Sequence, residues 1–353
     1  MRASAYNRAM RGFLHSLSIY HWVILLIGLG MTFAAVWPRQ TETGSKDAPQ
    51  PPALENSMAS VKEASVENSA PAPTPVPLEQ PVAGITPVTA AAESEAPGYT
   101  GVGMQTFDDG SIFRGEMLSG LPHGQGHMQF PDGRSYTGSF YYGRRQGAGE
   151  MHWPDGSYYN GEFINNQVSG RGEYNAAHGD RFVGSFVNEK PHGYGTYTMH
   201  NKNVYVGEVR QGIIEGHGTL TFSDGSVYSG EFVGGRMQGK GERYWPNGNH
   251  YTGEFKNDTF HGAGTATFSG GSTYQGQFAN GKPHGEGRRR WPDGRVYRGL
   301  WNNGLQQGFG VLTFANGDWF EGEFEAGKMH GVGTCVTGGV ESSCTFFQGE
   351  MLN

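Results

Sequence analysis

Residues 251–264 read YTGEFKNDTFHGAG, and residues 274–294 read YQGQFANGKPHGEGRRRWPDG. In both stretches an aromatic residue, counted here as position 0, is followed by glycine at positions 2, 11 and 13. The pattern recurs every 23 residues without a slip, and its starting residues are Phe113, Tyr136, Tyr159, Phe182, Tyr205, Tyr228, Tyr251, Tyr274, Tyr297 and Phe320. A fixed period of this length predicts a repeat architecture in which each unit packs against its neighbours.

The turn of each unit fixes the register expected for its strands. The Pro-Asp-Gly segment at 131–133 suits a three-residue hairpin loop, because proline presets φ, aspartate accepts a local hydrogen bond and glycine takes the left-handed conformation. Tyr136 is then expected to pair with Met128, and Gly138 with Gly126. Positions 15 and 17 share a face with the starting aromatics, and positions 14 and 16 point the other way. The sequence therefore predicts consecutive antiparallel hairpins.

One face of this sheet is expected to carry aromatic rings that lie over glycines. Most of these rings are expected to form the core. A single-layer sheet is not expected to bury its whole aromatic face, and an exposed apolar strip commonly marks a partner site. Part of this face, including Trp153 at position 17, is therefore predicted to remain a binding groove.

The repeated Tyr-x-Gly-Glu-Phe, His-Gly-x-Gly and Pro-Asp-Gly elements resemble those of the MORN (membrane occupation and recognition nexus) repeat family. The resemblance covers about residues 113–342 as ten units, with a half unit in front and a closing strand, FQGEM at 347–351, behind. It implies an all-β fold, an elongated single-layer antiparallel sheet of consecutive hairpins. Such repeats occur as scaffolds, dimerisers, peptide grooves and supposed lipid binders, so the resemblance specifies the fold more closely than the function.

The chain before the repeats has a different organisation. Residues 1–18 carry three arginines and no acidic residue, and residues 19–37 (IYHWVILLIGLGMTFAAVW) hold no Asp, Glu, Lys or Arg. As a helix the second segment reaches roughly 28 Å, enough to cross a bilayer core. The basic flank predicts a cytoplasmic tail, a single-pass anchor in the inner (cytoplasmic) membrane and repeats in the periplasm. A cleaved signal peptide is the alternative, which the length and flanking tryptophans disfavour.

Residues 38–98 are rich in proline, alanine and glutamate and are expected to form a disordered linker. Such a tether lets the repeat domain, residues 99–353, work well away from the membrane. The domain is net acidic, so nucleic acid is not an expected partner.

The two cysteines of the chain, Cys335 and Cys344, both lie in the last unit. An oxidising compartment permits a disulfide between them, and two free thiols are the alternative. Register argues against a simple pair if Phe347 takes the starting-aromatic slot, because Phe347 would then face Cys335 and leave Cys344 off that rung.

Catalytic and metal-binding patterns are not found in the repeats. Adjacent units lie about 10 Å apart, whereas zinc ligands must approach one ion to about 2 Å. The recurrent histidines therefore do not predict a metal site; they are His123, His192, His261, His284 and His330. No phosphate-binding loop or nucleophile elbow occurs. The sequence predicts no enzyme activity and no cofactor.

Two units break the repeat with arginine at position 15, which is otherwise apolar or small. Arg243 is followed on the same face by Trp245, and Arg289 by Trp291. Each arginine is expected either to stack on its tryptophan as a cation–π pair, or to line a charged aromatic groove. Such a groove would take an anionic ligand, such as an acidic peptide, a lipid phosphate or a glycan carboxylate.

These features together predict a membrane-anchored extracytoplasmic scaffold that binds a protein or peptide of the cell envelope along its aromatic face. A cell-wall or carbohydrate binder and an anionic-lipid binder are the alternatives. Open sheet ends also make a homodimer an expectation.

Overall fold

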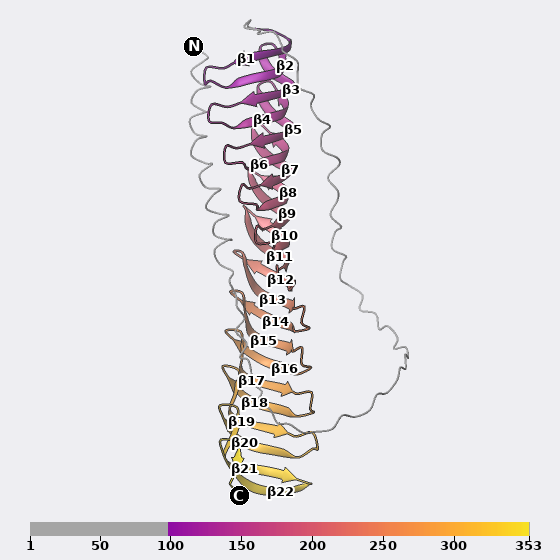
Figure 1. Ribbon diagram of the computed structural model, residues 1–353, viewed down its shortest axis with the longest axis vertical. Helices are drawn as coiled ribbons and strands as arrows, with labels where there is room; N and C mark the ends of the chain where they lie inside the picture. The colour runs from indigo at the N-terminus through magenta and orange to yellow at the C-terminus, as the bar shows by residue number, and fades with distance from the viewer. Residues whose placement is uncertain (1–97, 353) are drawn as a thin grey trace, which may run out of the picture. The chain divides into compact units, whose positions relative to one another are not determined.

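The computed structural model describes residues 98–352 of the chain. These residues form one open sheet of 23 β-strands, and no helix occurs among them. The strands follow one another along the sheet in chain order (Figure 1). The prediction of an all-β antiparallel array is therefore confirmed. In this part of the chain no helix is long and apolar enough to cross a membrane. The predicted tail (1–18), membrane span (19–37) and nearly all of the linker (38–98) lie outside the described residues.

Each strand pairs antiparallel with the next one along the chain. The strands of the first half are β1 (Gly101–Thr106), β2 (Ile112–Leu118), β3 (Leu121–Gln129), β4 (Ser135–Tyr141), β5 (Arg144–His152), β6 (Tyr158–Ile164), β7 (Gln167–Asn175), β8 (Arg181–Val187), β9 (Lys190–Thr198), β10 (Val204–Arg210), β11 (Ile213–Thr221) and β12 (Val227–Val233). Those of the second half are β13 (Arg236–Tyr244), β14 (His250–Lys256), β15 (Thr259–Thr267), β16 (Thr273–Ala279), β17 (Lys282–Arg290), β18 (Val296–Asn302), β19 (Leu305–Thr313), β20 (Trp319–Glu325), β21 (Lys328–Thr337), β22 (Val340–Phe347) and β23 (Glu350–Met351).

The hairpin turns set the register as the sequence predicts. Between β3 and β4 the N–H of Phe130 donates to the Arg134 carbonyl at 2.9 Å, which closes the three-residue loop. Met128 then pairs with Tyr136, and Gly126 with Gly138. The prediction from the Pro-Asp-Gly chemistry is thus confirmed.

A recurrent β-bulge was not predicted. Gly138 pairs with Gly149, but two residues later Phe140 pairs with Arg145, so β5 carries extra residues opposite β4. Gly147 lies in this bulge with a φ of 90°, a left-handed conformation that favours glycine. Where position 3 is glutamate, its carboxylate can accept a hydrogen bond from a bulge N–H, as Glu162 does from Arg171 at 3.2 Å. These recurrent glutamates therefore stabilise the bulge.

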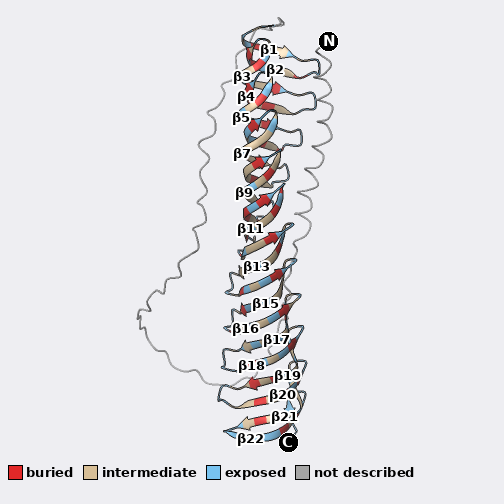
Figure 2. Ribbon diagram, turned by 180° about the vertical axis from the view of Figure 1, so that it is seen from behind, coloured by how far each residue is buried: buried red, intermediate tan, exposed pale blue. Residues whose placement is uncertain are grey.

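The core is a continuous ladder of rings lying on glycines. A Cβ atom added at Gly149 would come within 2.5 Å of carbons of the Tyr136 ring, so the ring rests directly on the backbone. The ring at position 4 packs edge-on between successive starting aromatics: Phe140 lies 5.0 Å from Phe113 and 5.1 Å from Tyr136. The resulting buried stripe runs along the sheet (Figure 2). Each unit therefore buries its aromatic residue partly under its neighbour's ring.

The starting aromatics are closed core, as expected for most rings of this face. Tyr136 is 0% exposed and Phe113 is 0% exposed, because the rings at position 4 close over them. Tyr174 and Tyr197 stay half-buried on this face, and so does the row of rings at position 17, next to the turns. These rings are Phe130, Trp153, Phe222, Trp245, Phe268, Trp291 and Phe314.

The last unit differs from the frame predicted for it. Cys335 pairs with Ser342, and Phe346 rather than Phe347 takes a core slot, 5.0 Å from the Phe320 ring. Phe347 is exposed, so the register argument against a cysteine pair does not hold. Cys344 is fully buried, and the structure joins Cys335 and Cys344 in a disulfide with 5.9 Å between their Cα atoms.

Candidate binding surface

The candidate surface is the edge of the aromatic face that lies beside the Pro-Asp-Gly turns. It consists of the half-buried position-17 rings named above, together with three arginines that pack against them. We call this set of residues the turn-edge strip; its arginines are Arg145, Arg243 and Arg289.

Arg243 lies on β13 between two starting aromatics. It pairs across the sheet with Tyr228 on one side and Tyr251 on the other. Its guanidinium carbon lies 4.2 Å from the centre of the Phe222 ring and 4.8 Å from that of Trp245. The Nη2 atom donates to the Ser226 hydroxyl at 3.1 Å. Arg243 therefore bridges aromatic rings of two successive units.

Arg289 occupies the same position two units later, on β17. Its guanidinium carbon lies 5.3 Å from the Phe268 ring centre and 5.0 Å from that of Trp291. A second arginine, Arg295, also lies over Trp291, at 5.4 Å. Both predicted Arg–Trp pairs are thus brought together, and each arginine also contacts a ring of the preceding unit.

The two arginines differ in their charged surroundings. Burial lowers the pKa of Arg243, while Asp224 and Asp258 act in the opposite direction. Burial also lowers the pKa of Arg289, and the positive charge of Arg295 lowers it further. Carboxylates thus partly balance Arg243, whereas Arg289 lies in positive surroundings.

Each guanidinium also retains hydrogen-bonding capacity. The Nε atoms of Arg243 and Arg289 are buried without a hydrogen-bond partner among the described residues. A buried donor that lacks a hydrogen-bond acceptor raises the free energy of the folded state.

The predicted site residues do not form one site. Arg243 with Trp245 and Arg289 with Trp291 are separate clusters on β13 and β17 and the turns after them. Trp153 follows β5, in a different part of the array, and lies edge-on to Tyr174 at 6.0 Å. The arrangement is a row of similar contacts along the turn-edge strip, not a pocket.

Sequence reasoning missed Arg145. It is 8% exposed, donates from Nη2 to the Asn166 carbonyl at 2.6 Å and lies 5.6 Å from the Phe163 ring centre. Burial lowers its pKa to about 10. The available signal was position 9, which Arg145 occupies and which is apolar in most units, as with Val168 in the next one.

A groove on the opposite face was also missed. Its volume is about 800 Å³, and its floor is backbone at Gly218, Gly230, Gly241 and Gly253. Polar side chains line it, among them Glu208 and Lys240. The signal was the set of polar residues at positions 1, 3, 12 and 14, which alternation places on this face.

Comparison with known proteins identifies the repeats. The sequence matches the family described as MORN repeat over ten segments, at residues 113–133, 136–158, 159–181, 182–204, 205–227, 228–250, 251–273, 274–294, 297–319 and 320–339. No curated protein matches the chain.

Two solved structures are similar in part. One is the TCP10 domain of Danio rerio CPAP in complex with a STIL peptide: 15% identity, 66% of this chain and 96% of that chain covered, TM-score 0.36. The other is the TCP domain of Drosophila melanogaster SAS-4 (dCPAP) in complex with a proline-rich motif of Ana2 (dSTIL): 13% identity, 50% and 85% covered, TM-score 0.27. Likeness at these TM-scores does not extend to function. On the ten matched segments, the chain belongs to the MORN repeat family.

Proposed function

We propose that this protein is a non-enzymatic repeat scaffold that binds an acidic protein or peptide segment along the turn-edge strip. The observation that carries the proposal is the pair of arginines set between aromatic rings at position 15. Each is half-buried and has a buried Nε atom without a hydrogen-bond partner among the described residues. A carboxylate of the partner pairs with the accessible part of each half-buried arginine in a charge-assisted hydrogen bond.

The fold itself does not require arginine at this position. Leu220 and Leu312 occupy it in other units, where they are 1% and 8% exposed. Cation–π stacking stabilises an arginine that is already present, but an aliphatic side chain fills the same slot with no charge to desolvate. The arginines are therefore best explained by a binding role.

The charge around Arg289 favours an anionic partner. Arg288, Arg290, Arg295 and Arg298 lie within ten residues of it, in a domain that is acidic overall. Arg288, Arg290 and Arg298 point to the opposite face of the sheet. Arg295 lies on the turn-edge strip itself, over Trp291, and its positive charge beside that of Arg289 needs a neutralising anion. An acidic peptide chain spanning several units satisfies this need and lays its apolar side chains against the position-17 rings.

The setting we propose for this scaffold is outside the cytoplasm, tethered by residues 19–37 to the inner membrane. Two observations support this. The N-terminal sequence has the length and charge pattern of a signal anchor. Cys335 and Cys344 are joined in a disulfide, a bond that persists in oxidising compartments. Binding to cell wall or anionic lipid remains the alternative use of the same arginines.

The test compares Arg243→Leu, Arg289→Leu and the double variant with the wild-type full-length protein. A desolvated arginine paired with an anionic group contributes about 1.5 to 3 kcal/mol, so each variant should bind envelope proteins roughly tenfold more weakly or worse. The thermal midpoint should be nearly unchanged, because leucine fits position 15.

Sedimentation with purified cell wall and with anionic vesicles, in parallel, separates the classes of partner. If the variants lose binding only to cell wall or only to vesicles, the partner is a glycan or a lipid and not a protein. If the double variant keeps all binding but melts far lower, the arginines are structural and the proposal fails.

The groove on the opposite face is a second candidate binding surface, favoured by its volume of about 800 Å³ and its bare glycine floor. Its polar lining, which includes Glu208 and Lys240, offers charged groups of both signs to a partner.

A further inference from the structure

Two successive turns depart from the Pro-Asp-Gly pattern. Residues 176–180 read AAHGD and residues 199–203 read MHNKN. The turns lie at the same edge of the sheet, after β7 and after β9. The first turn has His178 where several other units have aspartate. The second turn has His200 where several other units have proline. Asp180 closes the first turn.

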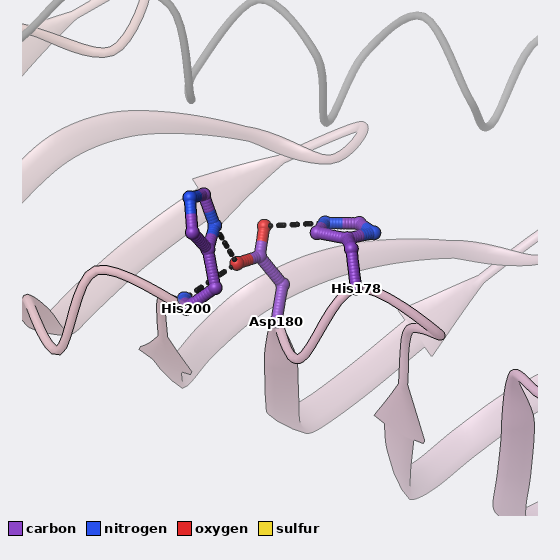
Figure 3. A group of neighbouring side chains, drawn as sticks. All are labelled: His178, Asp180 and His200. Atoms are coloured by element: carbon purple, nitrogen blue, oxygen red, sulfur yellow. Dashed lines mark hydrogen bonds and ion pairs between the residues drawn. The ribbon is translucent and has the colours of Figure 1, made fainter.

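The three side chains converge although they come from two units (Figure 3). His178 Nε2 lies 3.0 Å from Asp180 Oδ2, and His200 Nδ1 lies 2.9 Å from Asp180 Oδ1. One donor atom from each of the three residues lies within 4.8 Å of the other two. The two imidazole rings stand 5.9 Å apart and are exposed, whereas the carboxylate between them is partly buried.

Asp180 has a role in the turn that explains only part of this arrangement. Its Oδ1 accepts the backbone N–H of His200 at 2.7 Å. Asparagine makes the equivalent bond in other units: Asn203 accepts from the Ser223 N–H at 2.9 Å, and Asn249 from the Ser269 N–H at 2.7 Å. An amide is therefore enough to join one turn to the next. The carboxylate adds a negative charge and a second oxygen directed at His178.

We propose that His178, Asp180 and His200 form a binding site for a divalent first-row transition metal, with Zn²⁺ as the representative ion. Two imidazole nitrogens and one carboxylate oxygen are a ligand set that such ions favour, whereas Ca²⁺ and Mg²⁺ prefer oxygen alone. Ligand atoms about 2.0 to 2.2 Å from a tetrahedral ion lie roughly 3.3 to 3.6 Å from one another. Small rotations of the exposed imidazoles reach that spacing.

The site links two units where the regular turn chemistry is missing. Its carboxylate is already held by the His200 N–H, and such orientation of a ligand strengthens metal binding. Three protein ligands leave a fourth tetrahedral position open to water or to a group from a partner. Bound metal therefore stabilises the junction between the unit that begins at Tyr159 and the unit that begins at Phe182.

The test titrates the full-length protein with ZnCl₂ in competition with a chromophoric chelator and records the thermal midpoint with and without zinc. We expect one tight equivalent of zinc and a higher midpoint when it is bound. His178→Ala, His200→Ala and Asp180→Asn should each weaken this equivalent at least about tenfold and abolish the zinc-dependent rise. Asp180→Asn is the sharpest variant, because asparagine keeps the bond between the turns.

His152→Ala is the matched control. His152 is an exposed histidine beside another turn, where it contacts Glu150, and its loss should leave the tight equivalent unchanged. Circular dichroism without zinc should be the same for all variants, because the histidines are exposed. The proposal is overturned if the wild type binds no tight zinc, or if the three ligand variants bind zinc as strongly as the wild type does.

Discussion

Replacing a single glycine under a ring tests how the core is built. In the unit that begins at Tyr251, Gly264 lies beneath that ring. A Cβ atom at Gly264 would stand 2.7 Å from the ring carbons Cε2 and Cζ. The Tyr251 ring is 1% exposed and is held edge-on by Phe255 at 5.2 Å and Phe278 at 5.0 Å. Gly264→Ala therefore forces a locked ring to move.

The expected cost is large for one methyl group. Overpacking a well-filled core costs about 1 to 3 kcal/mol, and the closeness of this contact places Gly264→Ala near the upper end, at about 3 kcal/mol. A change of 1 kcal/mol shifts the midpoint of a domain of this size by about 2 to 4 °C, so thermal unfolding followed by circular dichroism should show a fall of roughly 6 to 12 °C.

Gly270→Ala is the control within the same unit, since a Cβ atom there meets nothing within 4 Å. A double-mutant cycle with Tyr251→Leu then assigns the cost to the ring: in that background Gly264→Ala should cost less than about 1 kcal/mol. If the Gly264→Ala and Gly270→Ala variants have the same thermal midpoint, the rings do not rest on the glycines and the description of the core is wrong.

Three further changes test other parts of the array. Lys202 has a φ of 69° where other turns have glycine. Lys202→Gly should stabilise the fold by about 1 kcal/mol, because the relief of backbone strain exceeds the entropic cost of glycine. A lower urea midpoint for this variant would contradict the prediction. Reducing the Cys335–Cys344 bond, which closes a short loop, should cost about 2 to 3 kcal/mol, and an unchanged midpoint in reductant would refute it. Hydrogen bonding to Arg181 lowers the pKa of Glu173 below its usual 4.5. The ionised carboxylate therefore contributes its full stabilisation of the fold above about pH 4.5, and this stabilisation is lost as the pH falls through the lowered pKa. Glu173→Gln should therefore reduce the loss of stability that the protein shows at acid pH. If the variant and the wild type lose stability equally at acid pH, the Glu173–Arg181 pair does not contribute as described.

The sequence predicted the strands well because turn chemistry and a period-2 pattern act locally. The Pro-Asp-Gly loop determines that Met128 faces Tyr136, and nothing distant changes that pairing. The bulge was missed because the glycines were interpreted only as residues that lie under aromatic rings. Gly147 at position 11 instead serves the backbone conformation of the bulge.

The candidate sites were predictable only where one unit broke the pattern. Arg243 and Arg289 were visible because they replace apolar residues at one fixed position. The closure of the ladder was not foreseen, since it depends on contacts between units, such as Phe140 against Phe113. The cluster around Asp180 was missed for the same reason, because its two histidines are 22 residues apart and meet only when successive turns are stacked.

The most direct test of the binding proposal is site-specific photo-crosslinking in the full-length protein within its native cells. A photoreactive aromatic residue is placed at Trp245 or Trp291 on the turn-edge strip, and at Ser229 or Thr252 in the groove of the opposite face. Binding along the turn-edge strip predicts a partner adduct from the two tryptophan positions that disappears in the Arg243→Leu, Arg289→Leu background. An adduct formed only from Ser229 and Thr252 would contradict it and place the partner in the groove.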